Sequence, residues 1–499
     1  MPRREYVSFF SDGRRGRRDF AGFEGRPGLS RILLPALAIA VLAVSVWWFG
    51  FRDADQSAGR ILTLEDATIP TLLLPAGSGN QDALDLASGE FLDCKEVADG
   101  WDMFQGSPSR QGCYATNTIA SPKILWRTEI GVQGWLNNPV IDNGSVYIGS
   151  AGVAQFTADR RDGIYSLDLA TGRQNWFYGT ELDVNGVAFS DGVVIATGDE
   201  GRVWGITARD GERIWSADLG APTYGNPLPV GGMVIVGDGS GHVTALDPKT
   251  GTRRWQVTVD GAVRGGAASD GSMIVMAGEN HEVLAVDLTG EELWRVKVQS
   301  QGRDAGQARI FAAPTIVDDM VIIGFVRSDV YSEPALAALD KATGTLKWRA
   351  SDVAGLKTST WANVRSSPAV VGAYLVYGEA YSNFLVTIDL ETGETRNAIE
   401  TGVYCQAHWP SPLVVNGQAI IPRNDGGLYA VDLASETLAW SIYLSNETST
   451  SGSFPAGFDA SACETGNSIL ASPAISPEGV IVVGTLKGYL VAIGDRGWG

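Results

Sequence analysis

The sequence predicts an all-β fold: an eight-bladed β-propeller of four-stranded blades, closed by an N-terminal strand and preceded by one transmembrane helix. Three observations carry this prediction. A motif of two strands and a turn recurs at a period of roughly forty residues, complementary half-repeats stand at the two ends of the repeated region, and one long uncharged stretch precedes it. Glycine is abundant, with 62 of 499 residues, as many tight turns require.

The repeated motif is Leu-Asp-x-x-Thr-Gly-x-x-x-Trp, which residues 241–255 show in full. The alternating residues before Asp247 suit a half-buried strand, the Asp247 carboxylate is placed to cap a turn, and Gly251 supplies the positive φ that the turn needs. The return strand then carries Trp255. A further alternating pair precedes each copy, as in residues 227–236, which makes four strands per repeat.

Eight positions mark the fourth strands of the repeats. Seven hold tryptophans that we expect to dock one blade against the next: Trp126, Trp176, Trp215, Trp255, Trp294, Trp348 and Trp440. Asn397 stands where the eighth tryptophan is expected. Residues 124–128 stand alone before the first full repeat and residues 488–493 form a third strand without its fourth, so the N-terminal piece is predicted to close the ring. A linear solenoid, the alternative, would not need complementary half-repeats at its ends.

The repeat, strand starts such as Ser367-Pro-Ala-Val and Ser472-Pro-Ala-Ile, and the segment Trp101-Asp-Met-Phe-Gln-Gly106 resemble the PQQ-type (pyrroloquinoline quinone) β-propeller repeat family over about residues 100–494. That family includes the eight-bladed lipoprotein of the bacterial outer-membrane barrel-assembly machine and, more distantly, the quinoprotein alcohol and glucose dehydrogenases. The resemblance implies the fold. It suggests a role in envelope biogenesis, although a fold shared by such different proteins specifies function poorly.

The N-terminal region is predicted to hold the chain in a membrane. Residues 1–31 carry eight arginines against four acidic residues and are predicted to be a basic cytoplasmic tail. Residues 32–51 lack charges and, at 1.5 Å per residue, match the ~30 Å hydrocarbon core as a transmembrane helix. Residues 52–93 are then an extracytoplasmic stalk and residues 94–499 the propeller. A cleaved signal peptide is the competing interpretation, but the apolar stretch is long and no clear cleavage site follows it.

This topology predicts a single-pass protein of the bacterial cytoplasmic membrane, with its N-terminus in the cytoplasm and its propeller periplasmic or extracellular. The four cysteines, Cys94, Cys113, Cys405 and Cys463, are even in number, and an exported compartment permits disulfides. Three connectivities are possible. Proximity along the chain and across adjacent blades favours Cys94 with Cys113 and Cys405 with Cys463.

The exported part is strongly acidic. The first 52 residues hold nine of the 38 basic and four of the 57 acidic residues, so 29 basic and 53 acidic residues follow, a net charge of −24. Such a surface repels phosphate backbones, which argues against nucleic acid as a partner. It fits a cationic partner, divalent ions or simply solubility.

Long loops are predicted to gather on one face. In a propeller the third-to-fourth strand turns lie on one face, and the loops that lead into first strands or join second to third strands lie on the other. All the long insertions fall in the second class: residues 150–162, 298–310, 327–335, 351–366, 401–410 and 444–470. We call this the decorated face and the opposite one the turn face. Loops on a rigid scaffold are where binding usually occurs.

These loops bring aromatic, amide and arginine side chains towards the axis. The candidate ligand- or partner-binding residues are Trp135, Asn137, Tyr224, Asn226, Arg264, Arg309, Trp361, Asn363, Arg365, His408 and Trp409. Such a funnel can hold an anionic or planar ligand, or a peptide strand. The structural alternative is that they are loop anchors packed between blades.

Catalytic signatures are absent: the sequence has no Gly-x-Ser-x-Gly elbow, no His-Glu-x-x-His helix, no phosphate-binding Gly-Lys-Ser/Thr loop and no Cys-x-x-Cys-His site. The glycine-rich residues 237–241 join two strands and are predicted to be a hairpin turn. His242 and His281 occupy equivalent repeat positions, which favours a structural role. Quinoprotein dehydrogenases hold their quinone with adjacent cysteines, a stacking tryptophan and calcium, and this sequence has no adjacent cysteines and no matching calcium set.

Two functions therefore compete. The first is a membrane-anchored extracytoplasmic scaffold that binds envelope or membrane proteins, without catalytic residues, metal or cofactor, and with an open axial funnel. The second is a PQQ-dependent dehydrogenase, or a related small-ligand-binding propeller, that uses PQQ with calcium and has a filled funnel. The missing catalytic residues favour the scaffold.

Overall fold

A computed structural model describes residues 95–96, 100–134, 137–298, 309–325, 336–350, 364–378, 384–401, 410–445, 449–450 and 468–495. The chain divides into two compact units, Met1–Ser78 and Gly79–Gly499, and every described residue belongs to the second. The predicted cytoplasmic tail, transmembrane helix and stalk thus lie outside the described residues. Within the described ranges, no helix has the length and apolar character needed to cross a membrane.

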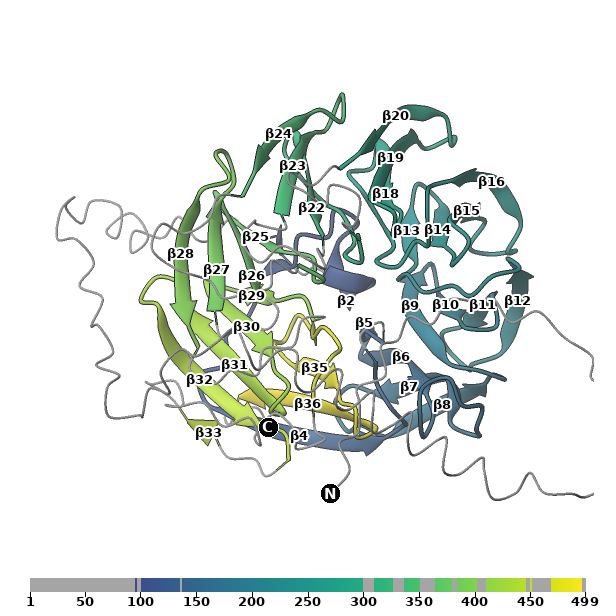
Figure 1. Cartoon of the computed structure of the whole chain (residues 1–499). Coiled ribbons are helices and arrows are strands. Elements are labelled where there is room, and N and C mark those ends of the chain that lie inside the picture. The colour runs from purple at the N-terminus through teal and green to yellow at the C-terminus, as the bar shows by residue number, and fades with distance from the viewer. Residues whose placement is uncertain are drawn as a thin grey trace, which may run out of the picture. The chain divides into compact units, whose positions relative to one another are not determined.

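The second unit contains eight sheets that follow one another around an axis (Figure 1). Each contains four antiparallel strands, which follow one another in the chain in seven of the sheets, while the eighth takes its fourth strand from the N-terminal side. The predicted eight four-stranded blades are therefore confirmed. Blade 1 contains β5 (Val140–Asp142), β6 (Ser145–Ala151), β7 (Asp162–Asp168) and β8 (Gln174–Gly179). Blade 2 contains β9 (Val184–Ser190), β10 (Val193–Gly198), β11 (Arg202–Thr207) and β12 (Arg213–Asp218). Blades 3 and 4 contain β13 (Leu228–Val230), β14 (Met233–Gly237), β15 (His242–Leu246), β16 (Arg253–Thr258), and β17 (Ala267–Ser269), β18 (Met273–Ala277), β19 (Glu282–Asp287), β20 (Glu292–Lys297).

The later blades repeat this plan. Blades 5 and 6 contain β21 (Thr315–Val317), β22 (Met320–Gly324), β23 (Leu336–Asp340), β24 (Leu346–Arg349), and β25 (Ala369–Val371), β26 (Tyr374–Gly378), β27 (Phe384–Asp389), β28 (Thr395–Glu400). Blade 7 contains β29 (Leu413–Val415), β30 (Gln418–Pro422), β31 (Gly427–Asp432) and β32 (Thr437–Tyr443). Blade 8 contains β34 (Ala474–Ile475), β35 (Ile481–Gly484), β36 (Tyr489–Asp495) and, from the N-terminal side, β4 (Pro122–Glu129). Short strands add to blades 1 and 7: β2 (Gly100–Trp101), β1 (Lys95–Glu96), β3 (Cys113–Ala115) and β33 (Ser449–Thr450).

The ring closes as predicted, because β4 from the N-terminal side is the fourth strand of blade 8. It pairs antiparallel with β36, with Trp126 opposite Ala492. No peptide turn joins these two strands, and a carboxylate takes its place. The Asp495 Oδ2 atom accepts hydrogen bonds from the backbone N–H groups of Ala120 (2.7 Å) and Ser121 (3.3 Å), just before β4 begins.

Adjacent blades dock through an indole and a turn. Six tryptophans of fourth strands donate their Nε1–H to a backbone carbonyl in the third-to-fourth turn of the next blade, at 2.6–3.0 Å: Trp126, Trp176, Trp215, Trp255, Trp294 and Trp348. In each such turn a positive-φ glycine lies under the ring, where a Cβ atom would come within 2.5–2.8 Å of an indole carbon. The motif glycine is therefore required by the preceding blade's tryptophan as well as by its own turn.

The two exceptions follow from this pairing. Blade 6 carries Asn397 instead of a tryptophan, and the turn that faces it in blade 7 has Glu436, at φ 59°, in place of glycine. Trp440 of blade 7 faces blade 8, which has no third-to-fourth turn. Its buried Nε1 finds no hydrogen-bond acceptor among the residues that the structure describes. The repeat thus loses its glycine, or its indole hydrogen bond, only where the partner element is missing.

The segment before β4, residues 100–117, contacts the inner strands of all eight blades and is named the lead-in segment. β2 pairs with β5 of blade 1, and β3 pairs with β29 of blade 7. Backbone carbonyls between them accept N–H groups from blades 2, 4, 5, 6 and 7: those of Asp102, Pro108, Ser109, Gln111 and Gly112. The segment reaches blade 3 through Arg110 and blade 8 through Thr116.

Arg110 fixes this segment near the axis. Its side chain is fully buried, and it donates to the carbonyls of Phe104 (2.5 Å), Ala267 (3.1 Å) and Pro227 (3.3 Å). The guanidinium also lies over the Phe104 ring, 5.5 Å from its centroid. Burial lowers the pKa of Arg110 to about 9, since no carboxylate is among these contacts.

Candidate functional site

The loops that lead into the first strands form a hydrogen-bonded belt around the axis. The belt consists of the serines of the Ser-Pro starts of blades 6, 7 and 8 and of one asparagine each from blades 1 and 3. In ring order, Ser367 Oγ donates to Ala313 O (2.9 Å), Ser367 N to Ser411 Oγ (2.9 Å), Ser411 N to Ser472 Oγ (2.8 Å), Ser472 N to Asn138 Oδ1 (2.8 Å), and Asn138 Nδ2 to Asn226 Oδ1 (3.2 Å). These serines and asparagines therefore serve the ring itself.

Little space remains inside this belt. The described residues leave an axial cavity of about 20 Å³, lined by belt residues together with Phe104 from the lead-in segment, Phe311 and Arg365. That is room for about one water molecule, whereas pockets for small molecules are typically ~300–1,000 Å³. The described residues also contain no group of three or more His, Cys, Asp or Glu arranged to hold a metal ion. This cavity is smaller than the funnel that either hypothesis expected.

Three of the predicted site residues meet on the decorated face through a carboxylate that the sequence analysis missed. The Glu279 side chain, 9 % exposed, accepts from Arg264 Nε (3.0 Å) and from Arg309 Nη1 (3.0 Å). The Arg264 guanidinium also lies 4.5 Å from the centroid of the Tyr224 ring, and burial raises the pKa of Tyr224. One carboxylate thus shares its charge between two arginines, so this cluster offers an anion less positive charge than its arginines suggest.

Three further predicted residues pack between blades. Asn137 is 2 % exposed and bridges blades 1 and 2, accepting from Gly134 N (2.9 Å) and donating to Val184 O (2.5 Å). Asn226 belongs to the belt, and Arg365 lies over Phe311, 5.6 Å from the ring centroid. These contacts match the structural alternative of interblade anchors. The remaining candidates lie outside the described residues: Trp135, Trp361, Asn363, His408 and Trp409.

Two smaller features of the sequence can also be located. Cys113 is buried on β3 and is disulfide-bonded, while Cys94, Cys405 and Cys463 lie outside the described residues, so the connectivity stays a prediction. Residues 237–241 form the predicted hairpin turn between β14 and β15. His242 contacts Asp238 within that turn, with 3.1 Å between Nδ1 and Oδ2.

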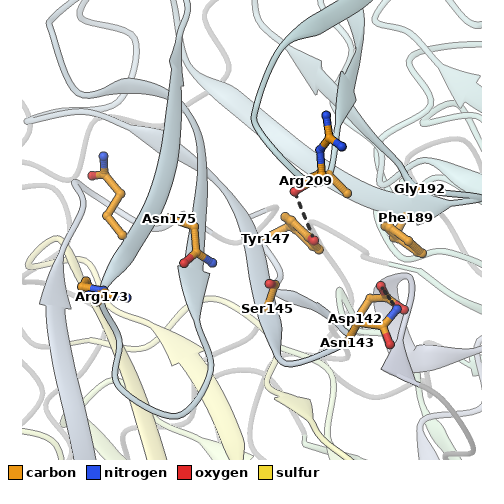
Figure 2. A pocket seen from close by; sticks show the side chains of 11 residues that line it. Asp142, Asn143, Ser145, Tyr147, Arg173, Asn175, Phe189, Gly192 and Arg209 are labelled. Atoms are coloured by element: carbon orange, nitrogen blue, oxygen red, sulfur yellow. Dashed lines mark hydrogen bonds between the residues drawn. The ribbon is translucent and has the colours of Figure 1, made fainter.

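An open cleft of about 820 Å³ lies between blades 1 and 2 on the turn face (Figure 2). Its floor is aromatic, because the rings of Tyr147 and Phe189 stack with centroids 6.0 Å apart and planes 7° apart. Exposed side chains around the floor include Arg173, Asn175 and Arg209. Figure 2 shows Tyr147 in the centre, with its hydroxyl directed at the Ala208 carbonyl, 3.5 Å away.

The chemistry of this cleft suits binding and not catalysis. Burial raises the pKa of Tyr147, so its hydroxyl stays protonated and acts as a donor. Asp142 accepts a hydrogen bond from Asn143 (2.9 Å), and Arg209 pairs with Asp210 (2.9 Å). An aromatic floor edged by amides and guanidinium groups can take an extended peptide, with a side chain on the floor and amides on its backbone.

The cleft escaped sequence reasoning because short regular turns form it, whereas the long loops lie on the other face. Comparing equivalent strand positions between blades reveals the feature that marks the cleft. Phe189 occupies the position that Val370 and Val414 hold in blades 6 and 7, as the identical pairing with the second strand shows. Tyr147 likewise stands at the register of aliphatic residues such as Ile195. Two aromatics at aliphatic registers of adjacent blades mark the site.

Fold and repeat together define the class of this protein: an eight-bladed β-propeller that closes on its own N-terminal strand. The family model described as "Outer membrane protein assembly factor BamB" matches residues 180–260 and 239–403. This match confirms, over residues 180–403, the resemblance to PQQ-type propeller repeats that the motif predicted. A search of curated protein sequences finds no match.

Solved structures show the same fold. BamB from Moraxella catarrhalis is 17 % identical, with a TM-score of 0.54 over 75 % of this chain and 99 % of that one. A europium-containing methanol dehydrogenase is 14 % identical, with a TM-score of 0.56 over 83 % and 100 %. A quinohemoprotein alcohol dehydrogenase from Comamonas testosteroni is 14 % identical, with a TM-score of 0.58 over 84 % and 85 %. At these identities the likeness concerns the fold alone.

Proposed function

We propose that this chain is a membrane-anchored, extracytoplasmic β-propeller that binds protein partners, in envelope protein assembly or in another complex of the bacterial cytoplasmic membrane. The packing of the axis carries the proposal. Phe104, Arg110 and the hydrogen-bonded belt occupy the described axial region and leave about 20 Å³. When a propeller's own chain occupies its centre, partners bind to its outer surfaces. Such surfaces are suited to binding proteins.

Three further observations support protein binding over cofactor chemistry. The family model that matches the chain is named for an outer-membrane protein assembly factor. The cleft between blades 1 and 2 has an aromatic floor edged by amide and guanidinium groups, a lining that suits a peptide. The two arginines predicted to meet an anionic ligand, Arg264 and Arg309, are both paired with Glu279. We accordingly propose that the protein works without PQQ, calcium or another cofactor.

The anchoring belongs to the same proposal. The uncharged residues 32–51 and the arginine-rich residues 1–31 support one membrane span with the N-terminus in the cytoplasm, residues 52–93 as a stalk, and a periplasmic or extracellular propeller. An oxidising compartment accords with the disulfide at Cys113, and we propose Cys94 as its partner and a second bridge between Cys405 and Cys463.

Native mass spectrometry of the full chain, gently solubilised from its own host and titrated with PQQ and Ca²⁺, tests the proposal. We expect a co-purifying protein at fixed stoichiometry and no mass increase from the quinone. Stoichiometric quinone binding, together with dye-linked oxidation of an alcohol or a sugar, would establish the dehydrogenase alternative instead, which the shared fold with methanol and alcohol dehydrogenases keeps in view.

A further inference from the structure

The loop between β6 and β7, residues 152–161, exposes two large apolar side chains on the decorated face of blade 1. Val153 is 64 % exposed and Phe156 is 61 % exposed, the two highest values among the large hydrophobic residues that the structure describes. Single exposed apolar residues are common on protein surfaces, but here two lie three residues apart in one loop. The question is whether the loop presents them in a fixed geometry.

Three carboxylates hold the backbone of this loop. Asp159 accepts the N–H groups of Val153 and Arg161, the latter at 2.6 Å. Asp162 Oδ2 accepts the N–H of Asp159 at 2.7 Å. Asp183, from the connection to blade 2, reaches across and accepts the N–H of Phe156 at 2.7 Å. The apolar tip is thereby attached to both blade 1 and blade 2.

This attachment comes at an energetic cost. Asp162 and Asp183 are 1 % and 2 % exposed, and within the described part of the chain each has an Oδ1 atom with no hydrogen-bond partner. Phe156 has φ 62°, a left-handed conformation that a non-glycine residue adopts only when its surroundings impose it. Strain and buried polar atoms concentrated at an exposed apolar tip are typical of a functional loop, because a fixed loop loses little entropy on binding.

Around the tip carboxylates outnumber basic groups. Glu129, Asp159, Glu181 and Glu200, with the buried Asp162 and Asp183, stand against Arg160, Arg161 and Arg202. Glu181 is exposed beside Thr180, which donates to the Asp162 carbonyl, and Glu181 N itself donates to Glu200 Oε1 at 2.6 Å. Arg161 is already paired with Glu129 at 2.5 Å. An apolar tip bordered by carboxylates complements an apolar pocket bordered by lysine or arginine, and it opposes anionic lipid.

We propose that the β6–β7 loop is the docking element for a protein partner, with Phe156 and Val153 entering an apolar pocket that has a basic rim. The inference rests on the proposed scaffold function and names the surface that performs it. Aromatic side chains held rigidly at the centre of a contact are the usual anchors of protein interfaces. The acidic rim then contributes to orientation and association rate.

Photocrosslinking in the native membrane tests this inference on the full chain. Benzoylphenylalanine is placed at position 153, and in a control chain at position 293 on β20, where Leu293 is 51 % exposed. We expect the probe at 153 to join one protein, through a partner peptide that is apolar and flanked by lysine or arginine. Adding Phe156→Ser to that chain should lower the yield at least tenfold, without changing the melting temperature, whereas Leu293→Ser should leave the yield unchanged.

The outcomes separate the two proposals. If the full chain retains a partner but the probe at 153 joins nothing, joins lipid, or gives the same products as the probe at 293, the docking loop is wrong and the scaffold function stands. A yield that Phe156→Ser does not reduce has the same meaning. If no protein is retained or crosslinked from any position, the scaffold function fails, and the docking loop fails with it.

Discussion

Replacing Gly251 by alanine would drive a methyl group into the indole of Trp215. At this position φ is 69°, and a Cβ atom would lie 2.5 Å from Trp215 Cε3, where carbon atoms normally approach to about 3.5–4.0 Å. The ring, only 8 % exposed between blades 2 and 3, would have to move by about 1 Å. Its Nε1 hydrogen bond to the Pro248 carbonyl, now 2.9 Å, would be strained or lost.

The magnitude follows from three contributions. Alanine in the left-handed region costs about 1–2 kcal/mol. Overpacking at a close-packed interface costs about 1–3 kcal/mol. A lost hydrogen bond adds about 1 kcal/mol. We expect Gly251→Ala to destabilise the propeller by about 3–6 kcal/mol and to lower the midpoint of urea-induced unfolding, measured by tryptophan fluorescence on the solubilised full chain.

Blade 7 offers the matched control. Glu436 occupies the equivalent turn position with φ 59°, and Asn397 replaces the tryptophan that would face it. Glu436→Ala should therefore change stability by less than about 0.5 kcal/mol. In a chain that already carries Trp215→Asn, the added loss of stability from Gly251→Ala should be smaller than in the wild-type chain. Equal losses for Gly251→Ala and Glu436→Ala, or simple additivity in the double variant, would refute the docking account.

Three further predictions concern charges. Burial raises the pKa of Asp183 to about 7 and that of Asp162 to about 6, so the folded state retains protons that the unfolded chain releases near pH 4. The stability of the fold should therefore fall as the pH rises from about 4 to 7. Asp183→Asn should reduce this fall in melting curves recorded across that pH range. Asp495→Ala removes the cap that stands in for the missing turn of blade 8; it should cost about 1 kcal/mol and speed hydrogen exchange in β4 while leaving β16 unchanged. Glu279→Gln removes the charge that Arg264 and Arg309 share; it should destabilise the chain by about 1–3 kcal/mol and raise its affinity for citrate in calorimetry, whereas unchanged affinity would mean that the arginines do not face solvent together.

Much of the architecture could be predicted from the sequence because a propeller repeats local information. A strand pair and its turn lie within about fifteen residues, so the Asp247 cap and the Gly251 turn are visible in one copy of the motif. The missing halves at the two ends then required β4 to close the ring. The deviations at Asn397 and Glu436 became explicable only once the structure placed them opposite each other.

The candidate site depended on contacts that spacing does not reveal. Arg264 and Arg309 were expected to face a ligand, but Glu279 lies between them on a different hairpin, fifteen and thirty residues away. Asn226 was expected in a funnel, yet it belongs to the belt, and Phe104 of the lead-in segment lines the small cavity beside it. Tyr147 and Phe189 belong to different blades, and only their registers bring them together.

The pairing of β4 with β36 also bears on how the protein reaches its folded state as the chain is synthesised. About 360 residues separate the end of β4 from the start of β36. At a synthesis rate of about 5–20 residues per second, roughly 20–70 s pass between the emergence of the two strands. During this interval β4 has an unpaired edge and an unburied Trp126, both hazards for aggregation. The same strand that removes the open edge from the finished ring thus leaves the growing chain with an open edge until its last blade arrives.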